Sequence, residues 1–178
     1  MYYGDEIGMT DTLIPAAEVQ DPAEKNEPGK GQGRDPERTP MQWDSSGFAG
    51  FTTGPPWLRL GAEHATVNVA TLSGQSESVL SLYRTLIALR NGNAALNSGR
   101  IEGVASSGRI LRYERVDEEQ RFAILLNFNQ SDQEAPIVAG HIVASTHMDR
   151  AGEVVESKVS LRPFEGVVVR VTVAPRSA

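Results

Sequence analysis

Residues 10–53 restrict the fold of this chain more than any other part, because they leave little room for a regular helix or strand. This segment carries prolines at five positions and glycines at three alternate ones, namely Pro15, Pro22, Pro28, Pro36 and Pro40, and Gly29, Gly31 and Gly33. Proline fixes φ, removes a backbone donor and restricts the residue before it. A loop this long in a compact domain is normally functional or disordered. We predict a long loop that is ordered over residues 34–43.

The stretch from Gly33 to Trp43 reads Gly-Arg-Asp-Pro-Glu-Arg-Thr-Pro-Met-Gln-Trp and concentrates charge in a stiff loop. Guanidinium groups bind carboxylates and sugar hydroxyls through several fixed donors. A tryptophan offers a flat apolar face and one N–H donor. These groups suit the rim of a sugar site, but arginines in proline-rich loops also tie such loops down. The chemistry alone favours the structural role and leaves the binding role open.

Periodicity predicts one helix, over residues 76–90. Apolar side chains recur on one broad face, at Val79, Leu80, Leu82, Tyr83, Leu86, Ile87 and Leu89. Ser76 is a suitable N-cap, and Asn91-Gly92 predicts a left-handed stop. A face of this width needs a large partner surface, such as the wall of a barrel.

From Gly99 onward the apolar pattern changes to a period of two, which is typical of β-strands. Apolar or alternating runs occupy residues 110–115, 122–128, 137–144, 154–161 and 166–173, with hairpin loops predicted at 117–120 and 129–133. Short strands separated by turn signals favour an antiparallel sandwich. We place the domain boundary near residues 95–98, which gives an N-terminal part of residues 1–95 and an all-β domain of residues 96–178.

The first residues, Met1 to Ile7, are interpreted as a short buried strand that ends at Gly4 or just beyond it. In a barrel of parallel strands the chemistry lies at the C-terminal ends of the strands. Asp5 and Glu6 would then face the mouth of an active site. A solvated acidic pair after a strand explains the same residues equally well.

Several stretches along the chain, in order, share their pattern with one family: Tyr2–Met9, Gln20–Pro22, Gly33–Trp43, Tyr83–Arg90, Asn127–Phe128 and Leu161–Gly166. Together they resemble the α-amylase superfamily (glycoside hydrolase family 13), in the branch of α-glucosidases and oligo-1,6-glucosidases. The resemblance implies an α+β fold: the last strand, a long loop and the last helix of a (β/α)8 barrel, followed by an antiparallel β-sandwich as C-terminal domain.

The resemblance also implies roles for single residues. The family's catalytic carboxylates lie on earlier barrel strands, and no carboxylate of this chain matches their motifs, so we predict no catalytic residue here. Arg34 matches the family's arginine that reaches the subsite of the terminal glucose. Asp35 is predicted as its orienting partner, and Glu6 as a further substrate-binding group. Arg38 is expected to tie down the loop, and Trp43 to be packed.

Composition excludes several classes of function. The chain has 17 basic and 23 acidic residues, a net charge of −6 and no clustered basic face, which argues against nucleic-acid binding. No apolar run approaches the length of a membrane helix, so no membrane partner is expected. Cysteine is absent, and the three histidines have no metal-ligand spacing. We expect no metal and no cofactor, and a cytoplasmic location.

Three functions remain open. The first is the C-terminal part of a retaining α-glucosidase that acts on α-linked gluco-oligosaccharides, has the rest of the barrel as partner and is inactive alone. The second is a transglycosylating or isomerising relative such as trehalose synthase. The third is a non-catalytic carbohydrate-binding or structural β-module. The sequence does not separate α-1,4 from α-1,6 preference, or hydrolysis from transfer.

Overall fold

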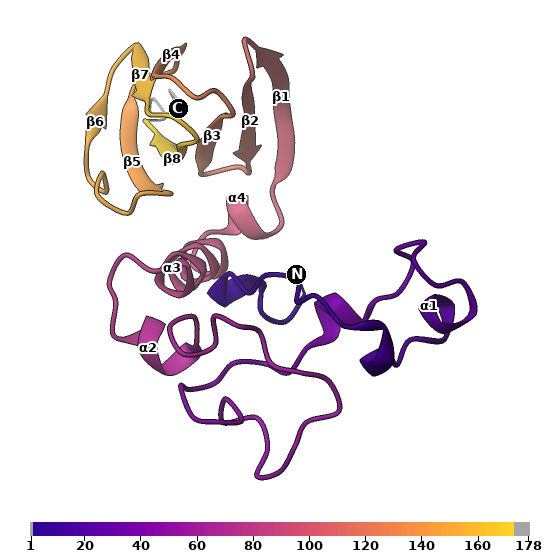
Figure 1. Cartoon of the computed structure of the whole chain (residues 1–178). Coiled ribbons are helices and arrows are strands. Elements are labelled where there is room, and N and C mark those ends of the chain that lie inside the picture. Colours follow the sequence, from indigo (N-terminus) through magenta and orange to yellow (C-terminus); the bar gives the residue numbers. More distant parts are fainter. Residues whose placement is uncertain (1, 173–178) are drawn as a thin grey trace. The chain divides into compact units, whose positions relative to one another are not determined.

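The computed structural model describes residues 2–172 of the 178-residue chain, which divides into two compact units (Figure 1). The N-terminal unit is Met1–Tyr83 and the C-terminal unit is Arg84–Ala178. Helix α3 (Val79–Asn91) runs across this division in the sequence. The domain boundary near residues 95–98 stays a prediction.

The N-terminal unit consists mainly of loops, and within residues 2–83 the structure has no strand. Its short elements before α3 are the 3₁₀ turns η1 (Asp5–Ile7), η2 (Ala16–Glu18) and η3 (Asp35–Arg38) and the helices α1 (Pro22–Asn26) and α2 (Val69–Ser73). The long loop predicted over residues 10–53 is therefore confirmed, apart from three short helical segments. Its buried core is small: Ile7, Met41 and Leu80 form one cluster.

The predicted strand over Met1–Ile7 is wrong for the described residues. Asp5–Ile7 forms a 3₁₀ turn between Gly4 (φ 93°) and Gly8 (φ 71°), both in the left-handed region. That region is incompatible with an extended strand and suits glycine, which has no Cβ. Tyr2 and Tyr3 are each more than 40% exposed, and among residues 2–7 only Gly4 and Ile7 are buried.

Helix α3 confirms the predicted helix, but its two predicted ends need correction. It begins at Val79 and not after Ser76, because the Ser78 hydroxyl accepts the free backbone N–H of Ser81 at 3.2 Å. It ends at Asn91 as expected, yet Gly92 does not adopt the left-handed conformation. Leu80 is its one buried residue within the described chain.

The C-terminal unit confirms the predicted antiparallel β-structure (Figure 1). After the short helix α4 (Ala94–Asn97) come β1 (Arg100–Ser107), β2 (Ile110–Val116), β3 (Arg121–Asn127), β4 (Gln133–Pro136), β5 (Gly140–Ser145), β6 (Val154–Val155), β7 (Lys158–Leu161) and β8 (Gly166–Val171). One sheet has the order β1-β2-β3-β8-β5-β6, and the other pairs β4 with β7. A single buried cluster contains residues of both sheets, for example Leu125 and Val169 from the larger one and Val159 from the smaller.

Several details of the predicted strands and loops differ from the structure. The run 137–144 becomes a strand only from Gly140, and residue 173 of the run 166–173 lies outside the described residues. Residues 117–120 do form a hairpin loop, in which the Asp117 carboxylate accepts the Glu119 and Gln120 N–H groups. Residues 129–133 do not, because β4 pairs with β7 and not with β3. The run 154–161 divides into β6 and β7, which belong to different sheets. A period-two pattern shows where strands lie but not which strands pair.

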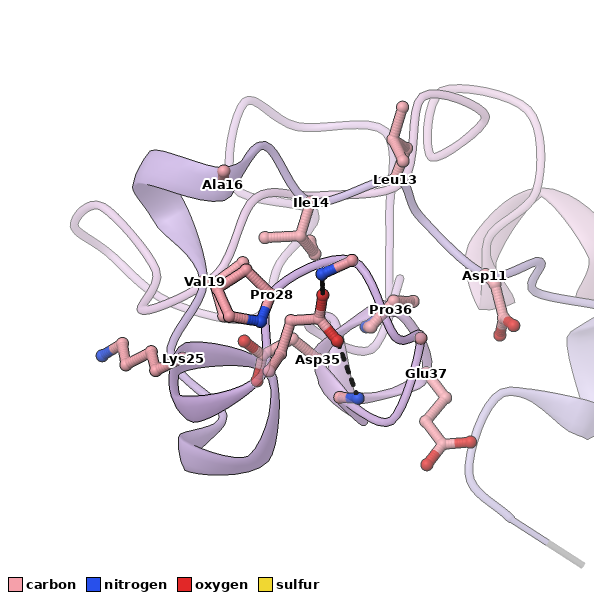
Figure 2. A pocket seen from close by; sticks show the side chains of 14 residues that line it. Asp11, Leu13, Ile14, Ala16, Val19, Lys25, Pro28, Asp35, Pro36 and Glu37 are labelled. Atoms are coloured by element: carbon pink, nitrogen blue, oxygen red, sulfur yellow. Dashed lines mark hydrogen bonds between the residues drawn. The ribbon is translucent and has the colours of Figure 1, made fainter.

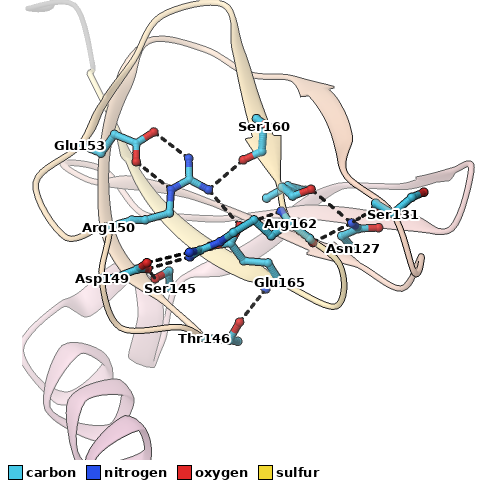
Figure 3. Close-up of polar contacts among 12 residues, drawn as sticks. Asn127, Ser131, Ser145, Thr146, Asp149, Arg150, Glu153, Ser160, Arg162 and Glu165 are labelled. Carbon is cyan, nitrogen blue, oxygen red and sulfur yellow. Dashed lines mark hydrogen bonds and ion pairs between the residues drawn. The ribbon is translucent and has the colours of Figure 1, made fainter. Parts of the chain in front are cut away.

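A buried carboxylate organises one end of the C-terminal unit (Figure 3). The Glu165 side chain is completely buried and accepts hydrogen bonds from Arg150 Nη1 at 3.0 Å and Arg162 Nη2 at 2.7 Å. Asp149 accepts two further bonds from Arg162, at 2.6 and 2.7 Å, and Glu153 binds Arg150. Charged groups removed from water need such partners, so this network is a structural one.

We predict that the C-terminal unit loses stability as the pH falls from about 4 toward 2. The hydrogen bonds from Arg162 lower the pKa of Asp149 to about 2, and those from Arg150 lower the pKa of Glu153. Carboxylates with a lowered folded-state pKa contribute stability above their unfolded pKa and lose it as they protonate. Urea midpoints measured between pH 7 and pH 2.5 test this. D149N should flatten the pH dependence, and an unchanged profile would contradict it.

We also predict that backbone amides in β3 and β8 exchange about 100-fold more slowly than those of residues 2–70. The C-terminal core joins eleven buried residues, whereas the N-terminal cluster has three. Amide exchange followed by NMR would show this directly. Equally slow exchange across both parts would mean that the N-terminal unit is as cooperative as the β-unit.

Candidate functional site

Two aspartates in the long loop are buried, although the loop is otherwise mostly exposed. Asp21 is 3% exposed and Asp35 is 2% exposed. Asp21 is the N-cap of α1, where its Oδ1 accepts the Ala23 N–H at 2.8 Å and Pro22 occupies the first helical position. Asp at the cap followed by Pro is a typical helix start. Asp35 begins the turn η3.

The two aspartates hold each other's chain segments. Oδ2 of Asp35 accepts the backbone N–H groups of Gln20 at 2.5 Å and Asp21 at 2.8 Å. In return, Oδ2 of Asp21 accepts the backbone N–H of Arg34 at 3.3 Å and its Nε–H at 3.4 Å. Segments 20–21 and 34–35 are therefore joined from both sides.

The Arg34 side chain is hydrogen-bonded at Nε and exposed at the end of its guanidinium group. Its side chain is 61% exposed, although its Nε bonds the buried Asp21. Within residues 2–172, no hydrogen bond involves its two terminal nitrogens. Arg38 approaches the same Asp21 oxygen to 3.7 Å, in line with its expected loop-tying role.

The carboxylate that contacts Arg34 is Asp21 and not Asp35, which corrects the predicted pairing. Asp35 follows Arg34 directly, but its carboxylate turns toward the backbone of residues 20 and 21. Its second oxygen, Oδ1, is buried without a hydrogen-bond partner in the described structure. An unsatisfied buried acceptor is costly, and such groups are common where a ligand or water supplies the missing donor.

A cavity of about 730 Å³ lies beside Asp35 (Figure 2). Its lining combines apolar side chains with acidic ones: Leu13, Ile14, Val19, Pro28 and Pro36, and Asp11, Glu24, Asp35 and Glu37. The Glu24 carboxylate closes one wall by accepting the N–H groups of Gly29 at 2.7 Å and Gly33 at 3.3 Å. The cavity thus places polar acceptors within an apolar frame.

Within the described residues, the Glu6 side chain forms no hydrogen bond with Asp21, Arg34 or Asp35. It is half-buried and accepts the backbone N–H of Gly4 at 2.9 Å, which stabilises the turn η1. The first segment does contact the Gly33–Trp43 stretch, since the Tyr3 hydroxyl donates to the Thr39 carbonyl at 3.0 Å. Substrate binding by Glu6 stays a prediction.

Trp43 was expected to be packed, and this expectation is wrong. Its side chain is about half exposed, while its backbone N–H donates to the Ala49 carbonyl at 2.8 Å. Met41 and Gln42 just before it are buried. The backbone bond to Ala49 fixes the position of residue 43, and the buried positions beside it are those of Met41 and Gln42.

Electrostatics keep Asp21 ionised. The Ala23 N–H lowers the pKa of Asp21 most, and the backbone and guanidinium of Arg34 lower it further, against the raising effect of burial. Asp21 is therefore a fixed negative charge beneath Arg34. Asp21 was not singled out from the sequence as a site residue, although Asp-Pro at 21–22 carries a helix-cap signal that could have identified it.

Within residues 2–172, no group of three or more histidine, aspartate or glutamate side chains is placed to hold a metal ion. Over the same residues, no helix is both long and apolar enough to cross a membrane.

Comparison with known proteins gives this geometry a context. The family described as "Alpha amylase, catalytic domain" matches residues 1–99, which include the loop with Asp21, Arg34 and Asp35. Glucan 1,6-α-glucosidase of Streptococcus pneumoniae is 30% identical over 95% of this chain and 35% of its own length. Oligo-1,6-glucosidase of Parageobacillus thermoglucosidasius is 30% identical over 96% of the chain and 35% of its own length.

The solved structure of trehalulose synthase MutB from Pseudomonas mesoacidophila superimposes with a TM-score of 0.83 at 25% identity, over 97% of this chain and 35% of the synthase. The chain thus spans 35% of the length of each of these relatives. The family match covers more than half of the chain. This chain belongs to the α-amylase family, glycoside hydrolase family 13.

Proposed function

We propose that this chain is the C-terminal part of a retaining α-glucosidase that acts on α-linked gluco-oligosaccharides. The observation that carries the proposal is the family match to residues 1–99, the region that contains the loop with the exposed Arg34 and the buried Asp35. Relatives named as glucosidases match over about 95% of the chain. In this proposal residues 1–95 complete a (β/α)8 barrel, and residues 96–178 form its stabilising β-domain.

The loop supplies groups on the substrate side of the reaction. The terminal nitrogens of Arg34 are oriented donors for sugar hydroxyls, because its Nε is already fixed. Asp35 Oδ1 is an acceptor that lacks a donor, and a sugar hydroxyl supplies one. Holding the glucose ring in place lowers the barrier by positioning it against groups elsewhere in the barrel.

The catalytic carboxylates belong, in this proposal, to barrel strands outside these 178 residues. Retaining glycosidases need two carboxylates about 5 Å apart, one as nucleophile and one as acid and base. Asp21 and Asp35 do not serve, since both are occupied with backbone N–H groups. The purified 178-residue chain is therefore expected to release no nitrophenol from a nitrophenyl α-glucoside above the level of contaminants.

The experiment that tests this function uses the native protein that contains the chain, captured from cells with an antibody against residues 99–178. We expect it to release glucose from isomaltose and maltose. Captured protein that releases no glucose from either sugar would overturn the proposal. The ratio of the two rates then assigns the bond preference.

A second candidate function is isomerisation of sucrose, favoured by the structural match to trehalulose synthase. The same captured protein, incubated with sucrose, distinguishes the two. A hydrolase gives free glucose and fructose or no reaction, whereas an isomerase gives a new disaccharide. Chromatography of the products is the readout.

A non-catalytic β-module gains one observation from the structure. Phe128 and Phe164 are 55% and 62% exposed, and the Phe164 N–H donates to the carbonyl of Asn129. Exposed aromatic rings are what a sugar-binding module needs. Saturable binding of maltose to the 178-residue chain, lost in F128A and F164A, would favour this role.

A further inference from the structure

We propose that Asp21 is a positioning residue that orients Arg34 toward the substrate. This inference rests on the proposed function, because it assigns the group that prepares the substrate-binding arginine. The Asp21 side chain is itself buried, so in this proposal it acts on the substrate only through its contact with Arg34.

The two oxygens of the Asp21 carboxylate have separate tasks. Oδ1 caps α1 through the Ala23 N–H at 2.8 Å. Oδ2 receives the backbone N–H and the Nε–H of Arg34, and it lies 3.7 Å from Nη1 of Arg38. A single carboxylate thus fixes the start of a helix, the backbone of the loop and the direction of one guanidinium.

The geometry leaves the useful end of Arg34 available. A guanidinium carries five N–H donors in a rigid planar fork, so fixing Nε fixes the direction of the other four. The side chain is 61% exposed while that of Asp21 is 1% exposed. A buried carboxylate fixes the Nε–H of the arginine, while its terminal N–H groups remain available to a ligand. This is the arrangement that a preformed binding group requires.

The position of Asp21 is itself fixed. The Asp35 carboxylate holds the N–H groups of residues 20 and 21, so the helix start cannot shift without breaking these bonds. Asp35 therefore fixes the backbone of residues 20 and 21, and Asp21 in turn fixes Arg34.

A purely structural role as a helix cap is the competing explanation, and the variant D21N separates the two. Asparagine caps helices as well as aspartate does, so it keeps an acceptor for the Ala23 N–H. It removes the charge that binds Arg34. D21S, which also caps, provides a second neutral variant if asparagine unfolds the loop.

The experiment measures the Nε–H resonance of Arg34 in the ¹⁵N-labelled 178-residue chain. We expect D21N and D21S to increase its rate of exchange with water about 10-fold, as loss of one charge-assisted hydrogen bond implies, while the unfolding midpoint changes little. D44N is the matched control, because Asp44 accepts the Ser46 N–H in the same unit and has no described contact with an arginine. An Arg34 exchange rate that D21N and D21S leave unchanged would overturn the inference.

The same variants in the native protein that contains the chain extend the test to catalysis. We expect D21N to lower kcat/KM for isomaltose about 10- to 100-fold at unchanged melting temperature. A fall in melting temperature that accounts for the whole loss would assign Asp21 to stability alone. The exchange measurement needs no activity, so failure of this inference and failure of the proposed function remain distinguishable.

Discussion

R34A in the native protein that contains this chain is expected to lower kcat/KM for isomaltose about 100-fold. Arg34 offers oriented donors on an otherwise exposed side chain, and misplacement of a bound substrate by about 1 Å costs a factor of this size. R34K should recover little of the loss, because an ammonium group cannot reproduce the planar fork or the bond from Nε to Asp21. Steady-state rates on isomaltose give the measurement.

Arg59 provides the matched control for this prediction. It is an exposed arginine in the same unit and forms its ion pair with Glu18, and not with Asp21 or Asp35. R59A should change kcat/KM less than about 2-fold, since exposed ion pairs contribute little. An R34A enzyme with wild-type kcat/KM, or an equal loss in R59A, would remove Arg34 from the substrate site.

E165Q is expected to destabilise the C-terminal unit by about 3 kcal/mol. Glu165 is fully buried and balances the charges of Arg150 and Arg162, so its neutralisation leaves two cations around an uncharged group. Removing one partner of a buried ion pair typically costs about 3–5 kcal/mol, and the retained amide oxygen places this change at the lower end. Urea denaturation followed by circular dichroism measures the effect.

The control for this variant is E134Q. Glu134 forms an exposed pair with Lys158, at 2.8 Å, between β4 and β7 of the smaller sheet. Its loss should cost about 0–0.5 kcal/mol, as for other exposed pairs. Equal destabilisation by E134Q and E165Q would mean that burial does not distinguish the two ion pairs.

The β-unit was largely predictable from sequence, since its information is local. Alternation over residues 110–115, the turn residues at 117–120 and the apolar run 122–128 predict β2, the hairpin and β3, and all three are present. Strand pairing was not predictable in the same way. Whether residues 133–136 pair with β3 or β7 depends on packing between sheets, and no local pattern in this sequence indicates it.

The N-terminal unit shows where local reasoning failed. The segment Met1–Ile7 can form a strand only if its backbone stays extended, and Gly4 and Gly8 in the left-handed region prevent this. Arg34 was identified from the family resemblance, and its substrate-binding role stays a prediction. Its contact with Asp21 crosses 13 residues of loop, which adjacency in the sequence does not indicate.

The proposal that this chain is part of a longer α-glucosidase is tested best by a size measurement. It compares the size at which an antibody against residues 99–178 gives a signal with the size at which glucosidase activity is found. Cell extract is separated by size, and each fraction is assayed for glucose release from isomaltose and probed with the antibody. We predict that the glucosidase activity and the antibody signal coincide in a chain several-fold heavier than 19.3 kDa. Antibody signal confined to a 19.3 kDa chain that separates from all glucosidase activity would contradict it.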